Sequence, residues 1–428
     1  MSLSATQQRS LKVFPAGSNG EFNLPDQMAV VISRGEGSKL WDTEGREYLD
    51  FSMGWGSVLV GHARPEVANA VRSQAVDGSN FAYVNQQSLA LAEELVRVSP
   101  ACDAVRFCAS GTEATMYCMR LARAHTGRTK ILKFEGAYHG ANDIGTISLF
   151  PQQAPPFPTA VPSSDGIWPE IQEYVLVAPF NDLETTRRIV IQHASDLAGI
   201  IVEPFHRCLA PIAGFLPGLR QLADDVGAAL IFDEVVTGFR FAYGGAQEYY
   251  GVVPELVAYG KALGGGYPIG AFGGRADIMD HVREDGLHAP GYVWVASTLG
   301  GNPVSCAAGC AALSVLRGEG VYRQLHRQGA YLRQGMAEVL AEAGIVAQIL
   351  GDGPLAQVVF CDTPITDYRS GRKANSQMGR DVMLELFRTH VFLNPMGTKL
   401  YLSLAHTDHD CDEFLRRFRV ALGRVARA

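Results

Sequence analysis

The sequence predicts an α/β protein, with a large domain built on a mostly parallel sheet between helices and a smaller α+β domain. Between about Pro65 and Val315, short apolar runs alternate with amphipathic segments, as in parallel strands connected by helices. After about Arg317 a long amphipathic helix and several short strands are expected instead. The length of 428 residues also exceeds what one hydrophobic core usually holds.

We therefore divide the chain into three segments. Residues 1–60 form an N-terminal segment with a hairpin that belongs to the small domain, residues 61–315 form the large domain, and residues 316–428 complete the small domain. The hairpin is expected from strands at residues 39–41 and 47–51, which the turn Asp42–Gly45 joins.

The alternating pattern also places the elements of the large domain. The expected strands are residues 105–108, 130–134, 199–202, 228–232 and 256–259, and the expected helices include residues 116–125 and 216–226.

The small domain is expected to contain two long helices. Residues 322–344 place Leu332, Met336 and Leu340 on one face, and short strands follow at residues 356–361, 391–393 and 400–404. Thr407 and Asp410 then form a capping-box signature for the last helix, whose apolar stripe consists of Phe414, Phe418, Leu422 and Val425.

Composition excludes several classes of protein. Hydrophobic residues make up 47% of the chain and charged residues 19%, so a disordered chain is excluded. A net charge of -7 gives no basic surface for nucleic acid or for an anionic membrane. No apolar run reaches the roughly 20 residues that a membrane span needs. The eight cysteines contain no CxxC pair, and the first ten residues lack the apolar run of a secretory signal, so we expect a reduced, cytoplasmic protein.

No metal site is expected. His406, Asp408, His409, Asp410 and Cys411 resemble metal ligands, but they lie at a predicted helix start, where acidic side chains satisfy free N–H groups.

Four segments contain residues suited to chemistry. The first follows the strand at residues 105–108, where Ser110, Gly111, Thr112 and Glu113 open a helix. Ser110 and Glu113 have capping-box spacing, and a helix N-terminus binds phosphate through its free N–H groups. Taken alone, the segment fits an ordinary capped helix equally well.

The second segment ends a buried strand with Asp233 and Glu234. A carboxylate at the carboxyl edge of a parallel sheet lies where α/β proteins bind ligands, and it can hold a protonated ring nitrogen or a metal ion. A second apolar strand ends in Glu203, which strengthens this interpretation over that of a solvated strand end.

The third segment places Lys261 after an apolar strand and among glycines at 260 and 264–266. A desolvated lysine has a lowered pKa and attacks carbonyl groups, whereas a lysine reaching solvent from a glycine-rich loop is the plainer explanation. The fourth segment, Gly136–Gly140, holds Tyr138 and His139, which could stack on a flat heterocycle or simply occupy a turn.

Together these segments describe a pyridoxal-phosphate site. Lys261 would hold the cofactor aldehyde as a Schiff base and later act as the general base, while Ser110, Gly111 and Thr112 would bind the phosphate. Asp233 would keep the pyridine nitrogen protonated.

The chain also resembles the class III aminotransferases of fold type I, most closely the glutamate-1-semialdehyde aminomutase branch. The resemblance lies in the segments 110–140, 200–204, 215–240, 249–275 and 297–303, and returns at Ser403–Thr407. It implies a pyridoxal-phosphate enzyme that moves an amino group between an amino donor and a carbonyl acceptor, with a seven-stranded sheet and a homodimer that shares its active sites.

The resemblance also implies further roles. Val235 and Tyr138 would pack on the two faces of the cofactor ring, with His139 beside Tyr138 and Glu203 in the polar wall. Thr298 would reach the phosphate of the neighbouring subunit, and Trp55 matches a substrate-side tryptophan.

The substrate side departs from the aminomutase pattern. Asn23 stands where an arginine that grips the substrate carboxylate is expected, and an amide cannot supply that charged fork. Near the C-terminus the segment Pro395–Tyr401 takes the place of a carboxylate-bearing one. These differences favour a changed substrate. Arg207 and Lys399 are candidates for a replacement anion contact, and both are equally well explained as surface charges.

Several alternatives remain open at this point. They are the aminomutase itself, a decarboxylase or epimerase that uses the same cofactor, and a non-catalytic relative that serves as a binding protein. A β-amino-acid transaminase branch is also similar, but its arginine is missing from Met396–Thr398.

Overall fold

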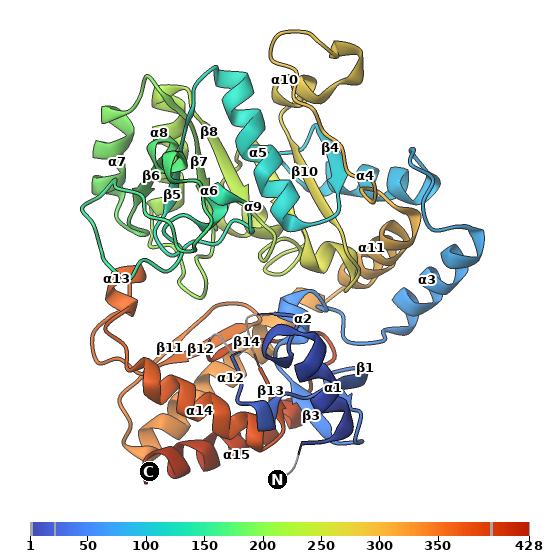
Figure 1. Cartoon of the computed structure of the whole chain (residues 1–428), viewed down its shortest axis with the longest axis vertical. Helices are drawn as coiled ribbons and strands as arrows, with labels where there is room; N and C mark the ends of the chain where they lie inside the picture. The colour runs from blue at the N-terminus through green and yellow to red at the C-terminus, as the bar shows by residue number, and fades with distance from the viewer. Residues whose placement is uncertain (1–2, 21–22, 394–396, 428) are drawn as a thin grey trace. The chain divides into compact units, whose positions relative to one another are not determined.

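The computed structural model describes residues 3–20, 23–393 and 397–427 (Figure 1). The chain divides into a small unit (Met1–Pro65, Glu319–Pro364 and Arg372–Ala428) and a large unit (Glu66–Gly318 and Ile365–Gly371). The boundaries predicted from the sequence lie after residues 60 and 315, and those of the structure lie after Pro65 and Gly318. The segment Ile365–Gly371, drawn with the small domain from sequence, packs within the large unit.

A seven-stranded sheet forms the centre of the large unit. Its strand order is β4 (Ala104–Cys108), β10 (Gly270–Gly274), β9 (Leu256–Tyr259), β8 (Ala229–Asp233), β7 (Leu197–Val202), β5 (Lys130–Phe134) and β6 (Val175–Ala178). Only β10 runs antiparallel to its neighbours, so the prediction of a mostly parallel seven-stranded sheet is confirmed.

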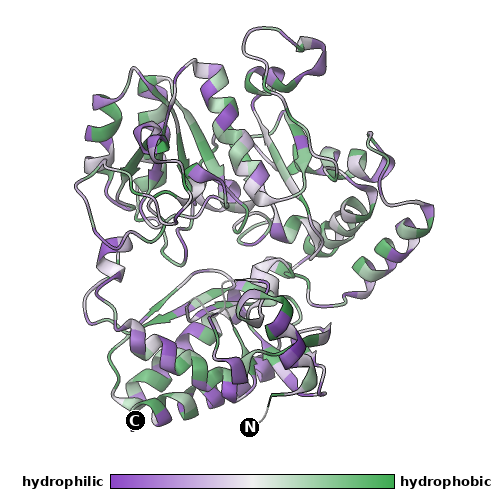
Figure 2. Ribbon diagram, in the orientation of Figure 1, coloured by the Kyte–Doolittle hydropathy of each residue, from purple (hydrophilic) through white to green (hydrophobic). Residues whose placement is uncertain are grey.

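The strands of this sheet are mostly hydrophobic (Figure 2), and helices pack against it. On β8, Ala229 and Ile231 share a core cluster with residues of α5 (Gly111–Thr126). Leu230 and Phe232 alternate with them and are equally buried, and α8 (Phe215–Val226) packs against β7 and β8. The other helices of the large unit are α3 (Pro65–Asp77), α4 (Gln86–Val98), α6 (Asp143–Thr146), α7 (Leu183–Gln192), α9 (Gly245–Tyr250), α10 (Ala276–Met279), α11 (Pro303–Leu316) and α13 (Tyr368–Gly371).

The described residues of the small unit form two sheets. The first has the order β1 (Ile32–Glu36), β2 (Lys39–Asp42), β3 (Glu47–Asp50) and β13 (Val391–Phe392), and its β2–β3 pair is the predicted hairpin. The second has the order β11 (Gln348–Leu350), β12 (Leu355–Val359) and β14 (Lys399–Tyr401). The helices are α1 (Ala5–Val13), α2 (Met53–Gly56), α12 (Val321–Ala343), α14 (Ser376–Arg388) and α15 (Asp408–Val425).

The two long helices of the small unit follow the prediction. Leu332, Met336 and Leu340 of α12 share one core with Phe414 and Phe418 of α15. The capping box of α15 is confirmed, because Thr407 Oγ1 accepts the Asp410 N–H at 3.2 Å and the Asp410 carboxylate accepts the Thr407 N–H at 2.8 Å.

The described residues contain no group of three or more His, Cys, Asp or Glu side chains placed to hold a metal ion. In the same residues no single helix is long and apolar enough to cross a membrane, and α11 and α12 meet that requirement only when counted together across their break.

Candidate active site

One edge of the large sheet gathers the candidate residues. Ser110 follows β4, Tyr138 follows β5, Glu203 follows β7, Asp233 ends β8 and Lys261 follows β9. These five strands run in the same direction, since β4 and β9 each pair antiparallel with β10 and the others pair in parallel. Their carboxyl ends therefore meet at one edge, where open α/β sheets bind ligands.

The start of α5 has the form of an anion site. Ser110 is its N-cap, as predicted, and its Oγ accepts the Glu113 N–H at 3.2 Å. The second half of the predicted capping box is wrong, because the Glu113 carboxylate accepts the Ala109 N–H at 3.0 Å instead. The 16-residue helix behind this cap directs its positive dipole end at whatever binds here.

Gly111 is required for close packing at this point. A Cβ on Gly111 would lie 2.8 Å from Val235 Cγ1, and a Cβ on Gly260 would lie 3.3 Å from the same atom. The start of α5, the segment after β8 and the residue before Lys261 are thus in mutual contact around Val235.

The Tyr138–His139 loop also contacts the start of α5. Gly140 has a φ of +91°, and a Cβ there would lie 2.6 Å from Thr112 Cα, so only glycine fits. Thr112 Oγ1 accepts the Ala141 N–H at 3.1 Å. The structure thereby brings the expected phosphate residues and the expected stacking residues together.

Asp233 is oriented by His139. The two side chains are nearly buried, and His139 Nδ1 lies 2.8 Å from Asp233 Oδ2. Asp233 Oδ1 accepts the Val235 N–H at 3.1 Å. His139 Nε2 is buried and has no hydrogen-bond partner among the described side chains and backbone, which is unusual for an imidazole unless a bound group completes the site.

Glu203 fixes the Tyr138 loop from the adjacent strand. Its carboxylate accepts the N–H groups of Tyr138 and Arg207, both at 2.9 Å. Burial alone would raise the pKa of Glu203, but the nearby Arg207, His206 and His139 outweigh it and lower the pKa to about 2. Glu203 is therefore a carboxylate at any working pH.

Lys261 begins the short 3₁₀ turn η4 (Lys261–Gly264) and is half-buried. Its φ is +46°, a left-handed conformation that is uncommon for a residue with a side chain. Strained conformations of this kind persist where the surrounding structure holds them, and they gather at functional sites.

Arg207 lies beside the Tyr138 loop, and its side chain is 40% exposed. Its Nε donates to Gly136 O at 3.0 Å, and its guanidinium lies 5.8 Å from the centre of the Tyr138 ring. Thr298 is exposed, and its carbonyl accepts a hydrogen bond from Asn80 Nδ2 at 3.1 Å.

Lys133 supports the same loop and was missed by sequence reasoning. It is fully buried in β5, and its ammonium donates to the carbonyls of Ala137, Gly145 and Ile147 at 3.0, 2.9 and 2.5 Å. Burial lowers the pKa of Lys133 to about 7, with a further lowering from Arg207 and an opposing effect of Glu203. A charged residue inside the apolar run at residues 130–134 was the available signal.

Arg369 was also missed. It forms two hydrogen bonds, of 2.8 and 3.0 Å, to the buried carboxylate of Glu135, directly before Gly136. It also packs 3.8 Å from the centre of the Phe157 ring. Because 234 positions separate the two charges, no local pattern links them.

Three expected substrate residues belong to the small unit. Trp55 is half-buried in α2, and Lys399 Nζ in β14 lies 4.9 Å from the centre of the Tyr401 ring. Asn23 is exposed, with its carbonyl accepting from Arg380 Nη2 at 2.7 Å. Two parts of the divergent stretches, Glu21–Phe22 and Pro395–Met396, lie outside the described residues.

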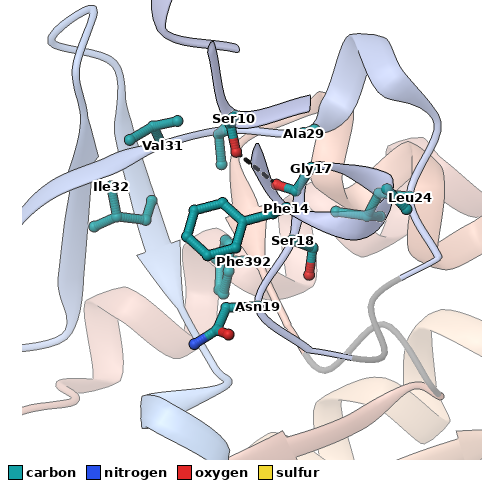
Figure 3. Close-up of a pocket in the computed structure, with 12 residues that line it drawn as sticks. Ser10, Phe14, Gly17, Ser18, Asn19, Leu24, Ala29, Val31, Ile32 and Phe392 are labelled. Carbon is teal, nitrogen blue, oxygen red and sulfur yellow. Dashed lines mark hydrogen bonds between the residues drawn. The ribbon is translucent and has the colours of Figure 1, made fainter. Parts of the chain in front are cut away.

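The stretch that includes Asn23 lines a pocket of about 290 Å³ in the small unit (Figure 3). Gly17, Ser18 and Asn19 form one side, and the aromatic rings of Phe14 and Phe392 lie within the lining. The Ser10 hydroxyl donates to Gly17 O at 2.8 Å and ties α1 to this wall.

The residues of the large unit fit a phosphorylated pyridine aldehyde. A helix N-terminus suits the phosphate, a buried and oriented carboxylate suits a protonated ring nitrogen, and a lysine amine suits the aldehyde. The buried His139 Nε2 is a further polar atom that a bound group would face.

Comparisons with known proteins agree with this geometry. The profile of the family described as Aminotransferase class-III matches residues 23–422. A glutamate-1-semialdehyde 2,1-aminomutase of Desulfitobacterium hafniense is 37% identical over 421 residues, which cover 97% of this chain and 96% of that protein.

Solved structures of transaminases share the fold of this chain over nearly its whole length. An omega-transaminase from Sphaerobacter thermophilus has a TM-score of 0.93 and 34% identity, covering 98% of this chain and 97% of its own. A transaminase with pyridoxal phosphate bound has a TM-score of 0.88 and 28% identity, over 98% and 97% of the two chains.

Proposed function

Since the chain belongs to the class III aminotransferase family, we propose that it is a pyridoxal-phosphate-dependent transaminase that acts on a substrate other than glutamate-1-semialdehyde. The enzyme moves an amino group from a donor to a separate carbonyl acceptor. The observation that carries this proposal is the buried Asp233–His139 pair, at 2.8 Å, on the same sheet edge as Lys261 and the start of α5.

The cofactor residues have separate tasks. Ser110, Gly111 and Thr112 bind the phosphate at the start of α5, and Asp233 holds the ring nitrogen protonated. Val235 and Tyr138 would hold the ring, and His139 keeps Asp233 in its orientation through the 2.8 Å contact of Nδ1 with Oδ2. When bound, the cofactor carries the amino group and withdraws electrons from the substrate carbon.

Lys261 would hold the cofactor through its aldehyde, and its amine would serve as the general base of the site. The left-handed backbone of Lys261 fixes where its side chain begins. The flexible side chain would let the amine reach both the cofactor aldehyde and the substrate. Glu203 and Arg207 keep the Tyr138 loop closed on one side of the site.

The substrate proposal rests on Asn23. The Asn23 side chain is a neutral amide that offers no charged fork for a substrate carboxylate, and the hydrogen bond from Arg380 goes to its backbone carbonyl. Arg207 is the better replacement anion contact of the two candidates, since it lies 5.8 Å from the Tyr138 ring, whereas Lys399 lies over Tyr401. Trp55 forms part of the substrate side, as the family resemblance implies.

A second function is favoured by one specific finding. The aminomutase of Desulfitobacterium hafniense is similar along nearly its whole length, so intramolecular exchange in glutamate-1-semialdehyde is the alternative activity.

We further propose a homodimer with shared active sites. Thr298 lies in an exposed loop beside Leu299, and Asn80 ties this loop to the segment that holds the exposed side chains of Phe81, Tyr83 and Val84. An apolar surface of this kind is typical of a subunit interface, and it would place Thr298 against a second subunit.

The protein's location also stays a prediction. All eight cysteines are free thiols and seven of them are buried, as expected for a reduced cytoplasmic protein.

Borohydride reduction of the purified enzyme, followed by peptide mass mapping, tests the cofactor assignment. Reduction is expected to fix pyridoxal phosphate to Lys261 and to leave Lys133, the matched buried lysine, unmodified. The variant Lys261→Ala is expected to bind the cofactor without covalent attachment. Modification at another lysine, or a wild-type protein that ignores added pyridoxal phosphate, would contradict the proposal.

A further inference from the structure

The turn that carries Trp55 is wound in the left-handed sense. Met53, Gly54, Trp55 and Gly56 have φ values of +47°, +58°, +57° and +80°. Residues with side chains rarely adopt this conformation, and two large ones within four successive residues are rarer still. A turn of this kind persists only where its surroundings hold it, and such strain gathers at functional sites.

One buried carboxylate holds the entry to this turn. Asp50 is fully buried, and its Oδ1 accepts the N–H groups of Ser52 at 2.7 Å and Met53 at 3.0 Å. Ser52 Oγ in turn accepts the Trp55 N–H at 3.5 Å. The direction of the Asp50 carboxylate therefore determines where the left-handed turn begins.

His62 fixes the direction of that carboxylate. Its Nε2 lies 2.7 Å from Asp50 Oδ2, the oxygen that the turn does not use. The backbone of His62 exchanges two hydrogen bonds of 2.9 Å with Gly37, so the imidazole is itself anchored. The chain of contacts runs from His62 through Asp50 and Ser52 to Trp55.

We propose that Asp50 and His62 are positioning residues that hold the left-handed turn and thereby aim the Trp55 indole at the substrate. They act on substrate affinity through Trp55 and do not touch the substrate. The effect on affinity rests on the proposed function, in which Trp55 forms part of the substrate side, whereas the effect on the turn does not.

The chain offers a matched control. Asp42 lies in the same sheet, is also buried, and also caps a turn, since its carboxylate accepts the N–H groups of Glu44 and Arg46, both at 2.9 Å. That turn does not carry Trp55. Asp42→Asn should therefore disturb a carboxylate-capped turn without changing the Trp55 environment.

The test compares His62→Ala, His62→Gln and Asp42→Asn in a background where Trp41, Trp168 and Trp294 are replaced by Phe. Acrylamide quenching then reports Trp55 alone. We expect His62→Ala to raise the quenching constant about twofold or more, because the released turn exposes the indole. His62→Gln should restore the wild-type value, since its amide can donate to Asp50 as the imidazole does. Asp42→Asn should leave the value unchanged.

The kinetic arm uses the native background and whichever of L-alanine, L-glutamate or β-alanine donates its amino group. A misplaced binding group can cost on the order of 100-fold, so His62→Ala should lower kcat/KM about 10- to 100-fold, mainly through KM. Combined with Trp55→Phe, His62→Ala should add little further loss, because both changes act on the same contact.

The outcomes separate the two proposals. Unchanged Trp55 quenching in His62→Ala, or losses in kcat/KM that add fully with Trp55→Phe, would overturn the positioning role. If the triple-Phe background does not fold, near-ultraviolet circular dichroism replaces quenching. The Trp55 signal is then the difference between a protein and its Trp55→Phe version, and it should differ between wild type and His62→Ala. An unchanged Trp55 signal would overturn the positioning role. If no donor reacts, the proposed function fails while the quenching result still decides the role of His62.

Discussion

At the scale of single residues, the site depends on carboxylates that their neighbours hold in a fixed orientation. Asp233 is held by His139 and by the Val235 N–H, and Glu203 accepts two backbone N–H groups. Asp233 is buried and Glu203 is mostly buried, so these contacts fix the direction of each carboxylate.

Asp233→Asn removes the charge and keeps the shape. The amide can still accept from the Val235 N–H, so the fold should be retained. Without the carboxylate the ring nitrogen loses its counter-charge, and kcat for transamination should fall about 10²- to 10³-fold, as for other losses of a preorganised electrostatic contact. Circular dichroism and steady-state kinetics on the same preparation check this, and a kcat within threefold of wild type would contradict it.

Glu203 makes the free energy of unfolding depend on pH. Its pKa is lowered from 4.5 to about 2, so the folded state favours the carboxylate and gains stability above the unfolded value. That gain, about 3 kcal/mol, is lost as pH falls from about 4.5 through 2.

The measurement is urea unfolding of wild type and Glu203→Gln between pH 3 and 7. Wild type should be the more stable at pH 7, and the difference should shrink steadily below pH 4.5. A difference that does not vary with pH would show that Glu203 is not the linked group.

At the scale of elements, the Tyr138 loop is held by segments that are remote in sequence. The Lys133 ammonium donates to three backbone carbonyls in and near this loop. Arg369 of α13 adds an ion pair with Glu135, directly before Gly136. Loops that present functional side chains need such rigid support.

Breaking the Arg369–Glu135 pair should cost stability. Arg369→Ala leaves the Glu135 carboxylate buried and unpaired, and we expect a loss of about 3 kcal/mol in the free energy of unfolding. The double variant Arg369→Ala/Glu135→Gln should recover part of the loss, because the unpaired charge is gone. If the double variant is as unstable as the single one, packing of Arg369 on Phe157 matters more than the charge.

Those strands of the large unit that are marked by an apolar run could be predicted from the sequence. The strands that precede Ser110 and Lys261, and the strand that ends at Asp233, are largely apolar runs, and a parallel sheet necessarily brings their ends to one edge. Two strands of the large sheet were not predicted. In β10 the residues Gly-Ala-Phe-Gly-Gly are poor in the branched and aromatic residues that mark strands, whereas β6, Val-Leu-Val-Ala, is an apolar run that was overlooked. A Cβ on Gly270 would lie 2.2 Å from Ser110 O, so these glycines serve close packing under the site.

Other features could not be predicted from one sequence. The Arg369–Glu135 pair joins segments with no shared pattern, and the left-handed turn at Trp55 depends on His62 and Asp50 together. Ser110 and Glu113 have the spacing of a capping box, but the Glu113 carboxylate does not accept the Ser110 N–H. It accepts the Ala109 N–H and the Ser297 hydroxyl instead.

At the scale of the whole molecule, the proposed homodimer makes each active site depend on two chains. Mixed dimers of Lys261→Ala and Thr298→Val subunits test this. One of the two sites in a mixed dimer would combine Lys261 and Thr298 from different chains, so reassociation should restore about a quarter of wild-type activity. The control is each variant reassociated alone, and activity equal to the average of the two would contradict a shared site.

Nitrogen transfer between two molecules is the most direct test of the central claim. The enzyme, loaded with pyridoxal phosphate, is incubated with a panel of ¹⁵N-labelled amino donors and unlabelled carbonyl acceptors, and the products are analysed by mass spectrometry. A transaminase transfers the label to a separate acceptor, which is the predicted result. Rapid conversion of glutamate-1-semialdehyde to 5-aminolevulinate, with no label reaching any separate acceptor, would contradict it.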